Sequence, residues 1–507
     1  MLRKRFVARQ AAVGAFRTAE KPHDEKTALT YNAYNFIIVL SNREDIVMYC
    51  LQNRWKIEGK NLVYYGLRNK LFKNKVKISE KQRKIIEKLP RDLSSEDIKT
   101  LGKLVGEQVV DERDLRKTPK SLDEARFCTD CVANDFIIPG LEFDEQGRCP
   151  MCQTAEKAKN LKSILPIIDD IPHSKKSRFD VAVFYTGGKD STFLLYYLAK
   201  VKKLRVLALT WEIPYISDGA KQSIENAKKH FETVEFVVRR VSNADLKKFY
   251  AKLYELAGNT CACPSLAYVL FYPEMVDNKI PYFIAGNEPV QMLGLYYNHM
   301  APTIAYKFAD MPFLTFLFNL TRVFTLRPPI KQGQIQSLMT VKQLAYGNPL
   351  VKLSGYQNEL VANVTKALHE VPEFLPPLKR AIRRSSMTGN IPAFVHLDFD
   401  EICGGKYDWN AVKDILVKEC GWVAPDANEK ALHTSCKIER CKDRSQFIRF
   451  YNCQSKTIPF SALEISLSSK NCGRTKEETI TEMKNSLGFT LEELPECRFI
   501  HEYLDEK

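Results

Sequence analysis

The chain has 507 residues, of which 45% are hydrophobic and 27% are charged, a balance typical of globular rather than disordered or fibrous proteins. No apolar run reaches the roughly 18 residues of a membrane-spanning helix. The N-terminus lacks the apolar core of a secretory signal, although its Arg-rich start leaves an organellar transit peptide open. Fourteen cysteines, several in close pairs, indicate metal binding in a reducing compartment. We therefore expect a cytoplasmic protein of several domains.

The first 120 residues are predicted to form a small basic α/β domain with no assigned role. Most of the net charge of +15 lies here, because residues 1–127 contain 28 Lys or Arg and 17 Asp or Glu. The expected elements are strands at 35–40 and 61–67, a helix at 43–55, and helices within 75–127 that are interrupted at Pro90 and Pro119. Such a domain can attract nucleic acid, an anionic sugar nucleotide, a membrane surface or an acidic protein. An ordinary positively charged surface would have the same composition.

A compact cysteine module is expected at 126–155. It contains two C-x₂-C pairs separated by seventeen residues, which are formed by Cys128, Cys131, Cys149 and Cys152. Two such knuckles supply four thiolates, the ligand set of a closed tetrahedral Zn²⁺ site. In a short module with little apolar core, the metal stabilises the fold. We therefore predict a zinc site with an architectural role.

From residue 175 to about 300, apolar runs alternate with helical patterns. The expected strands are 180–185, 205–211, 233–239 and 281–286. Strands separated by helices predict an α/β fold with a doubly wound parallel sheet. Residues 301–507 have mainly helical patterns and are expected to form the substrate-binding and C-terminal region. Within them, the apolar stretch 311–326 contains Arg322 and is predicted to be a buried helix or the wall of a pocket.

The sequence Thr-Gly-Gly-Lys-Asp-Ser-Thr at 186–192 joins the first of these strands to a helix. In a parallel sheet ligands bind beyond the carboxyl ends of the strands, and a helix start offers N–H groups and a positive dipole to phosphate. Gly187 and Gly188 permit unusual backbone dihedrals and the close approach of an anion. Lys189 adds charge, and further donors are the hydroxyls of Thr186, Ser191 and Thr192. The spacing differs from the Walker and dinucleotide-binding motifs, so we predict a phosphate loop of another kind.

This stretch resembles the pyrophosphate loop, or PP-loop, of the N-type ATP pyrophosphatases. Those enzymes split ATP into AMP and pyrophosphate, usually while adenylating an oxygen of the substrate. The resemblance implies that Asp190 helps to hold Mg²⁺, that Ser191 contacts phosphate and that Lys189 takes part in catalysis. The intact loop argues against a scaffold that retains only an inactive nucleotide fold.

The same resemblance implies further contacts with ATP. Adenine would lie near Thr210 and Trp211, at the end of the next strand. A second turn near the nucleotide, Ile-Ala-Gly-Asn-Glu-Pro at 284–289, would contribute Gly286 and Glu288.

The segment between the cysteine pairs, 138–149, is similar to the start of the N-acetyl sugar amidotransferase family, in which a zinc-knuckle module precedes a PP-loop domain. The stretches 280–291 and 461–483 also resemble that family. The resemblance implies an AMP-forming enzyme that replaces an oxygen of a nucleotide- or lipid-linked acetamido sugar with ammonia, giving an acetamidino group for surface glycans. It also implies a separate glutaminase that delivers the ammonia. The order of Asn287 and Glu288 departs from the family pattern.

A second interpretation is sulfur transfer to tRNA by a PP-loop enzyme. One class of these enzymes pairs zinc knuckles with three cysteines that bind an iron–sulfur cluster. Cys261, Cys263 and the distant Cys436 could form such a set for a cluster or for zinc, with RNA attracted by the basic domain. The C-x-C spacing differs from the C-x₂-C of that class, and small buried side chains would give the same pattern. For His433 and Cys441 the same two interpretations remain, a metal ligand or an ordinary buried side chain.

Overall fold

The computed structural model describes residues 48–68, 74–106, 109–112, 117–153, 167–168, 170–286, 289–298, 312–347, 359–425, 432 and 435–505. They divide into two compact units, one from Met1–Gln52 and Ile78–Leu115 and the other from Asn53–Lys77 and Arg116–Lys507. The strand expected at 35–40 lies outside the described residues. Among the described helices, none combines the length and apolarity needed to cross a bilayer.

Among its described residues, the first unit has two short strands and two short α-helices. β1 (Cys50–Leu51) pairs antiparallel with β5 (Val110–Asp111). Between them lie α3 (Glu80–Ile86) and α4 (Ser95–Leu101), which continues into the 3-10 helix η1 (Gly102–Leu104). Both α-helices begin with a capping box, in which a serine hydroxyl accepts from the N–H three residues later. Helices are therefore present on either side of Pro90, as expected.

The helix expected at 43–55 is wrong for the described part of that range. The N–H of Tyr49 donates to the carbonyl oxygen of Arg91 over 2.9 Å, and the N–H of Gln52 donates to that of Val109 over 2.8 Å. Arg54 has a φ of 78°, which no regular helix tolerates. The backbone groups are thus paired between distant segments, which the local apolar spacing does not reveal.

A three-stranded antiparallel sheet of order β2-β3-β4 opens the second unit. Its strands are β2 (Trp55–Glu58), β3 (Asn61–Tyr64) and β4 (Lys75–Lys77). β3 confirms the strand expected at 61–67. The buried guanidinium of Arg54 donates to the carbonyl oxygens of Tyr65 over 2.5 Å and Phe450 over 2.7 Å, which attaches this sheet to the C-terminal region.

The centre of the second unit is a five-stranded, wholly parallel sheet of order β10-β9-β6-β7-β8. The strands are β6 (Val181–Phe184), β7 (Val206–Trp211), β8 (Glu235–Arg239), β9 (Tyr282–Ile284) and β10 (Ala393–Phe394). The first four confirm the predicted strands. The chain builds outward from β6 through β7 to β8, and then returns to place β9 on the other side of β6. The order therefore reverses between β6 and β9.

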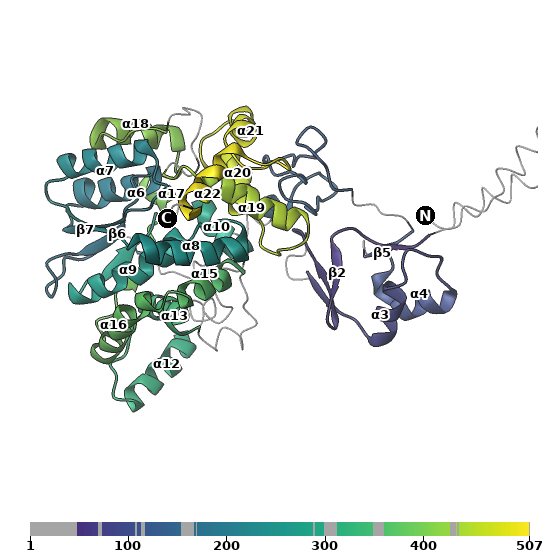
Figure 1. Cartoon of the computed structure of the whole chain (residues 1–507), viewed down its shortest axis with the longest axis horizontal. Helices are drawn as coiled ribbons and strands as arrows, with labels where there is room; N and C mark the ends of the chain where they lie inside the picture. The colour runs from purple at the N-terminus through teal and green to yellow at the C-terminus, as the bar shows by residue number, and fades with distance from the viewer. Residues whose placement is uncertain are drawn as a thin grey trace, which may run out of the picture. The chain divides into compact units, whose positions relative to one another are not determined.

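Helices cover both faces of this sheet (Figure 1). One face carries α6 (Lys189–Tyr196), α7 (Asp218–His230) and α18 (Trp409–Cys420), and the other carries α8 (Asn243–Ala257), α9 (Cys263–Asp277), α13 (Gln334–Tyr346), α15 (Glu359–His369) and α16 (Leu375–Thr388). Successive residues of a strand point to opposite faces. Val181 and Val183 accordingly pack in the first core, and Ala182 and Phe184 pack in the second. The predicted doubly wound parallel fold is confirmed.

The described part of 301–507 is mainly helical, as predicted, and β10 is its contribution to the sheet. The other elements after β6 are η2 (Tyr197–Val201), α10 (Pro289–Tyr297), α12 (Pro312–Phe324), η3 (Pro372–Phe374), α17 (Phe399–Ile402), α19 (Glu439–Tyr451), α20 (Phe460–Asn471), α21 (Lys476–Asn485), η4 (Pro495–Cys497) and α22 (Arg498–Asp505). For 311–326 the expectation of a buried helix is wrong, since most apolar side chains of α12 are exposed, and the alternative, the wall of a pocket, stays a prediction.

Candidate functional site

Residues 186–192 connect β6 to α6 in a tight turn. Gly187 has a φ of +72°, and a Cβ at this position would lie 2.4 Å from the carbonyl oxygen of Ala220 in α7. Glycine is therefore required both by the backbone conformation and by the space. The indole N–H of the buried Trp422 donates to the carbonyl oxygen of Gly187 over 3.1 Å. The turn is thus held in place by a residue of the C-terminal region.

The hydroxyl groups of Ser191 and Thr192 fix the shape of this turn. The Oγ atoms of Ser191 and Thr192 donate to the carbonyl oxygen of Gly188 over 3.1 and 2.9 Å. The N–H of Thr186 donates to Ser191 Oγ over 3.2 Å. Ser191 and Thr192 are buried, whereas Thr186 is exposed. Ser191 and Thr192, two of the predicted phosphate donors, therefore also make hydrogen bonds within the loop. Thr186 lies on the solvent-exposed side of the loop.

Lys189 and Asp190 form an ion pair that the C-terminal region covers. The side chain of Lys189 is 2% exposed, and its ammonium contacts Asp190 Oδ1. The hydroxyl of Tyr407 donates to the same Oδ1 over 2.7 Å. The ammonium also lies 4.7 and 4.8 Å from the ring centroids of Tyr407 and Trp409. The ammonium of Lys189 thus contacts the carboxylate of Asp190, and the charge that Lys189 would add at a phosphate stays a prediction.

The turn after β9 lies against the loop after β6. A Cβ at Gly286 would lie 3.0 Å from the backbone nitrogen of Ser191 and 3.2 Å from the carbonyl carbon of Asp190. This place, between β6 and β9, is the topological switch point at which open α/β sheets bind ligands. No side chain caps the start of α6, so the helix offers its N–H groups and dipole to an anion. Glu288, predicted for the same turn, lies outside the described residues.

Two buried polar atoms at the end of β7 have no hydrogen-bond partner among the described residues. They are the Oγ1 of Thr210 and the Nε1 of Trp211. Leaving such an atom unpaired costs about 1–3 kcal/mol, and in a folded protein it calls for a bound ligand or water. Both residues stand at the carboxyl edge of the sheet, where adenine was predicted. A nucleobase has the donors and acceptors to pair with them.

A pocket lined by three cysteines lies at the same edge of the sheet. Its lining consists of Ile213, Tyr215, Tyr250, Thr260, Cys261, Cys263, Cys436, Ile438, Glu439 and Lys442. Cys263 begins α9, and Cys436 lies on a segment that pairs with the residues after β7. In that pairing the N–H of Lys437 donates to the carbonyl oxygen of Tyr215 over 2.8 Å. The structure therefore brings together the three cysteines that the sequence suggested as a set. His433 lies outside the described residues.

The chemistry of this pocket combines thiols with an unsatisfied hydroxyl. Contact with Cys261 and burial raise the pKa of the Cys263 thiol, and burial raises the pKa of the Cys436 thiol. These thiols therefore carry their protons at neutral pH unless a cation displaces them. The Oγ1 of Thr260, also buried, has no hydrogen-bond partner in the described structure. The pocket thus has donors and soft ligands available to a bound group.

The four cysteines of the module form a much tighter cluster. All four are buried, and their sulfur atoms lie within 4.8 Å of one another. The Sγ atoms of Cys131 and Cys149 are 3.8 Å apart, which matches the ~3.8 Å edge of a tetrahedron with 2.3 Å zinc–sulfur bonds. The N–H of Cys149 points to the Sγ of Cys128 over 3.2 Å. The group therefore fits a single tetrahedral metal ion. Within the described part of the chain, no other group of three or more His, Cys, Asp or Glu ligands is as close.

The residues that suggested a sugar amidotransferase have structural tasks in this module. Asp144 Oδ1 accepts from the N–H groups of Gln146 and Arg148 over 3.0 and 2.8 Å. Gly147 has a φ of +78°, and a Cβ there would lie 2.9 Å from the side chain of Thr129. In the later stretch, Arg474 pairs with Glu482 in a buried contact. These residues shape turns and helix ends, so they carry little information about the substrate.

Several residues of the site could not be found from the sequence. Tyr407, Trp409 and Trp422 cover the loop, and Glu439 and Lys442 line the cysteine pocket. All of them lie more than 200 residues after the loop or more than 170 residues after Cys263. The nearby aromatic residues in Tyr-Asp-Trp at 407–409 were a weak signal at best, because aromatic side chains are common in any core.

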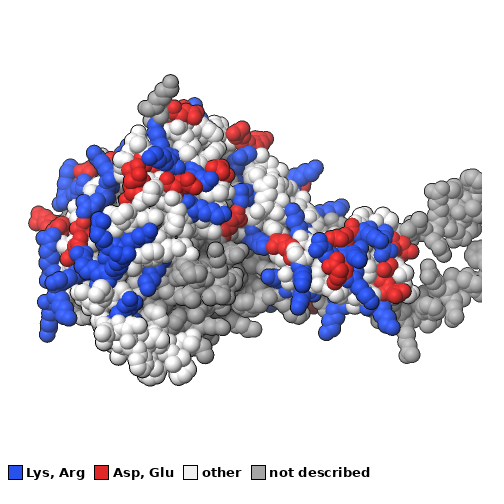
Figure 2. Space-filling model, turned by 60° about the horizontal axis from the view of Figure 1, so that its bottom comes forward, with Lys and Arg blue, Asp and Glu red and all other residues white. Residues whose placement is uncertain are grey.

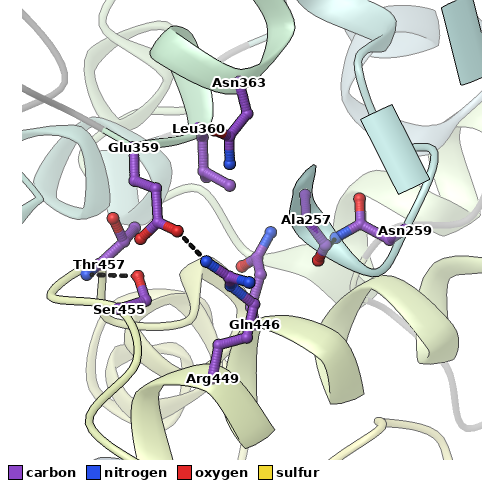
Figure 3. A pocket seen from close by; sticks show the side chains of 9 residues that line it. All are labelled: Ala257, Asn259, Glu359, Leu360, Asn363, Gln446, Arg449, Ser455 and Thr457. Atoms are coloured by element: carbon purple, nitrogen blue, oxygen red, sulfur yellow. Dashed lines mark hydrogen bonds and ion pairs between the residues drawn. The ribbon is translucent and has the colours of Figure 1, made fainter. Parts of the chain in front are cut away.

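A second recess lies where α8, α15 and α19 meet (Figure 3). It is lined by Ala257, Asn259, Glu359, Leu360, Asn363, Gln446, Arg449, Ser455 and Thr457. Arg449 and Glu359 form an ion pair across it. Asn259 connects it to the cysteine pocket, because its Oδ1 accepts from the N–H of Cys261 over 2.9 Å and its Nδ2 donates to Ser445 over 2.6 Å. These contacts hold the segment before α9 in position.

Comparisons with known proteins add little to this description. No family model matches the chain, and no curated protein matches it. Among solved structures, the U34-tRNA thiolase NcsA from Methanococcus maripaludis with its [4Fe-4S] cluster is similar, with 16% sequence identity. The match covers 52% of this chain and 86% of the thiolase chain, with a TM-score of 0.21. A score this low supports no argument. The class of the protein therefore rests on the structure itself. It is an α/β protein with a parallel sheet, a loop at the switch point of that sheet, a four-cysteine group arranged for metal binding and a mainly helical C-terminal region.

Proposed function

We propose that this chain is an ATP-dependent enzyme of the PP-loop type, which transfers AMP to an oxygen of an acceptor and releases pyrophosphate. The observation that supports this most is the position of the 186–191 loop at the switch point between β6 and β9. The uncapped start of α6, the left-handed Gly187 and the close turn at Gly286 form a hollow of backbone N–H groups. Such a hollow suits the outer phosphates of ATP.

Asp190 is the residue that would hold Mg²⁺ at these phosphates. Its Oδ1 contacts Lys189 and Tyr407, and its Oδ2 has no partner among the described residues. Carboxylate oxygens are the protein ligands that Mg²⁺ prefers, with phosphate and water completing the shell. Lys189 and Tyr407 thus act as positioning residues that orient the carboxylate.

In the proposed reaction the acceptor oxygen attacks the α-phosphorus of ATP, and the bond from that phosphorus to the bridging oxygen breaks. Pyrophosphate leaves with the electron pair, and a second nucleophile later displaces AMP from the acceptor. The protein contributes the alignment of the two reactants and the neutralisation of charge on the departing pyrophosphate. Thr210 and Trp211 would orient the base.

The three-cysteine pocket favours sulfur as the second nucleophile. Thiolates bind soft metals and iron–sulfur clusters. Cys261, Cys263 and Cys436 share one pocket. Three is also the number of cysteines with which the sulfur-transferring class of PP-loop enzymes binds its cluster. The acceptor would then be a base carbonyl of RNA.

Ammonia is the second candidate, with an acetamido sugar as acceptor and a separate glutaminase as partner. It is supported by the similarity of residues 138–149 to the sugar amidotransferases. In the four-cysteine module we propose one Zn²⁺, because the 3.8 Å sulfur separation fits a single ion.

The test is AMP formation from α-labelled ATP by the full chain. One reaction contains total tRNA with sulfide, and the other contains a nucleotide-linked N-acetyl sugar with ammonium. Asp190→Asn should lower AMP formation at least about a hundredfold, whereas Glu225→Gln on the exposed face of α7 should not change it. Equal turnover by Asp190→Asn and the native chain would refute the proposal, as would the absence of any ATP-dependent rise in melting temperature.

The two reactions separate the candidates. AMP formation with tRNA and sulfide, together with absorbance near 400 nm in protein purified without oxygen, supports sulfur transfer. AMP formation only with the sugar and ammonium, by colourless protein, supports amidation.

A further inference from the structure

Helix α12 exposes its apolar face to solvent. Its outward side chains follow a helical stripe with positions i, i+3, i+4, i+7 and i+11, formed by Phe313, Phe316, Leu317, Leu320 and Phe324. Their exposed fractions are 65, 59, 39, 40 and 80%. A stripe at this spacing normally packs on the protein core.

The polar side of the same helix faces inward. Asn319 exchanges two hydrogen bonds with the backbone of Ile330, over 2.8 and 2.9 Å. The buried guanidinium of Arg322 donates to the carbonyl oxygens of Pro328 and Ser386, each over 2.8 Å. The polar residues therefore attach α12 to the loop that follows it and to α16. The outward direction of the apolar stripe is set by specific contacts.

An exposed stripe of this kind marks a binding surface. Soluble proteins rarely leave contiguous apolar patches in water unless something covers them. Here the rings of Phe313 and Phe316 lie 6.5 Å apart in a stacked arrangement, and Phe324 and Leu326 extend the apolar surface at the end of the helix.

The segments that follow and contact α12 are rich in basic residues. Residues 312–347 and 375–390 together contain eight Lys or Arg and no Asp or Glu, although Arg322 is buried and Arg384 pairs with Asp277. Arg327, Lys331, Arg380 and Arg383 are exposed. Burial and the charges of Arg327 and Arg322 lower the pKa of Lys342, as expected in a positive local potential. Figure 2 shows Lys and Arg side chains gathered beside a broad area without charged side chains.

We propose that α12 binds flat to the surface of an anionic phospholipid bilayer. Its Phe and Leu side chains would enter the boundary between headgroups and acyl chains, and the neighbouring Arg and Lys would contact phosphate. With 13 residues the helix is too short to span. A second copy of this chain fits less well, because a symmetric contact would bring two basic clusters together.

The experiment measures sedimentation of the full chain with vesicles of phosphatidylcholine alone or with about one third phosphatidylglycerol. The native chain should bind the anionic vesicles at least about tenfold more strongly, and high salt should remove the difference. Phe313→Ser/Phe316→Ser/Phe324→Ser should lower this binding at least about tenfold, because three aromatic anchors are lost. Arg380→Glu/Arg383→Glu should remove the preference for anionic vesicles.

A matched control is Val201→Ser/Val417→Ser/Leu491→Ser, which changes exposed apolar residues elsewhere in the second unit and should bind like the native chain. All variants should keep the native melting temperature, because the altered side chains lie in solvent. The proposal is overturned if the native chain does not bind anionic vesicles, or if Phe313→Ser/Phe316→Ser/Phe324→Ser binds them as strongly as the native chain. It is also overturned if that variant only converts a dimer to a monomer in light scattering, which would assign the stripe to a second copy.

Discussion

The two groups of cysteines in the second unit differ in exposure and in their neighbours. Cys128, Cys131, Cys149 and Cys152 are buried, and their sulfur atoms lie within 4.8 Å. Cys261, Cys263 and Cys436 are partly exposed and line one pocket. Backbone N–H groups point at sulfurs of the first group, whereas an unpaired hydroxyl, an ammonium and a carboxylate line the second.

This difference shows how one residue type can serve two purposes. A metal site whose four positions are filled by protein has no place for a substrate and acts as a structural element. A pocket with three cysteines and a hydroxyl that has no hydrogen-bond partner can still bind another group. The two sites should therefore respond differently to the same substitutions.

The largest effect is expected from Cys149→Ser in the closed group. Loss of one ligand should release the metal and lower the free energy of unfolding by about 4 kcal/mol or more. Metal content by mass spectrometry and thermal unfolding measure both changes, with Cys453→Ser as a control outside the module. A variant that keeps one metal equivalent and the native melting temperature would show that the module is not a metal site.

Cys261→Ser/Cys263→Ser in the open pocket should leave the metal of the module and the melting temperature nearly unchanged. AMP formation with tRNA and sulfide should fall at least about a hundredfold, because the pocket loses its soft ligands. If the variant unfolds like Cys149→Ser, the pocket is structural and the comparison fails.

The pH dependence of alkylation should separate the two groups further. The pKa values of Cys263 and Cys436 are raised, and only the thiolate reacts. Their reaction with iodoacetamide should be slow at pH 7 and accelerate about tenfold per pH unit above it, whereas metal-bound cysteines should stay protected. Peptide mass spectrometry measures each site.

The same raised pKa values predict a loss of stability in alkaline solution. The unfolded chain releases thiol protons near pH 8.5, before the folded chain does. The stabilising contribution is therefore complete below that pH and is lost as the pH rises through the folded pKa. Unfolding curves should show this fall for the native chain and a smaller one for Cys263→Ser.

The smallest effect is expected from Thr260→Val. Removing an unpaired buried hydroxyl should stabilise the ligand-free protein by about 1 kcal/mol and weaken turnover. Thr479→Val is the matched control, because the hydroxyl of Thr479 is buried and donates to Thr475 over 2.7 Å. It should destabilise by about 1 kcal/mol. Destabilisation by both changes would indicate that Thr260 has a partner and that the pocket is closed.

The sequence predicted those parts of the fold whose signals are local. Four strands of the parallel sheet, the loop at 186–192 and the C-x₂-C pairs each depend on residues close in the chain. The helix expected at 43–55 was wrong over its described part, 48–55, because the backbone there pairs with distant segments. The fifth strand, β10, was missed because two residues carry no periodicity.

The sequence predicted the loop of the candidate site but not the residues that cover this loop. Tyr407, Trp409 and Trp422 reach the loop from a part of the chain that has no motif. The three pocket cysteines could be suggested as a set, but only the pairing of residues 435–437 with 215–217 brings Cys436 to the others. The apolar run at 311–326 predicted a helix, but such a run does not say whether its apolar side chains face the core or the solvent.

The late position of β10 has a consequence for synthesis on the ribosome. Until residues 393–394 emerge, β9 has an unpaired edge that can join other chains. The indole that holds Gly187 arrives later still, at residue 422. A nascent chain therefore makes the loop at 186–192 early but cannot secure it until more than 200 further residues have been added, and we expect chaperones to bind it during that interval.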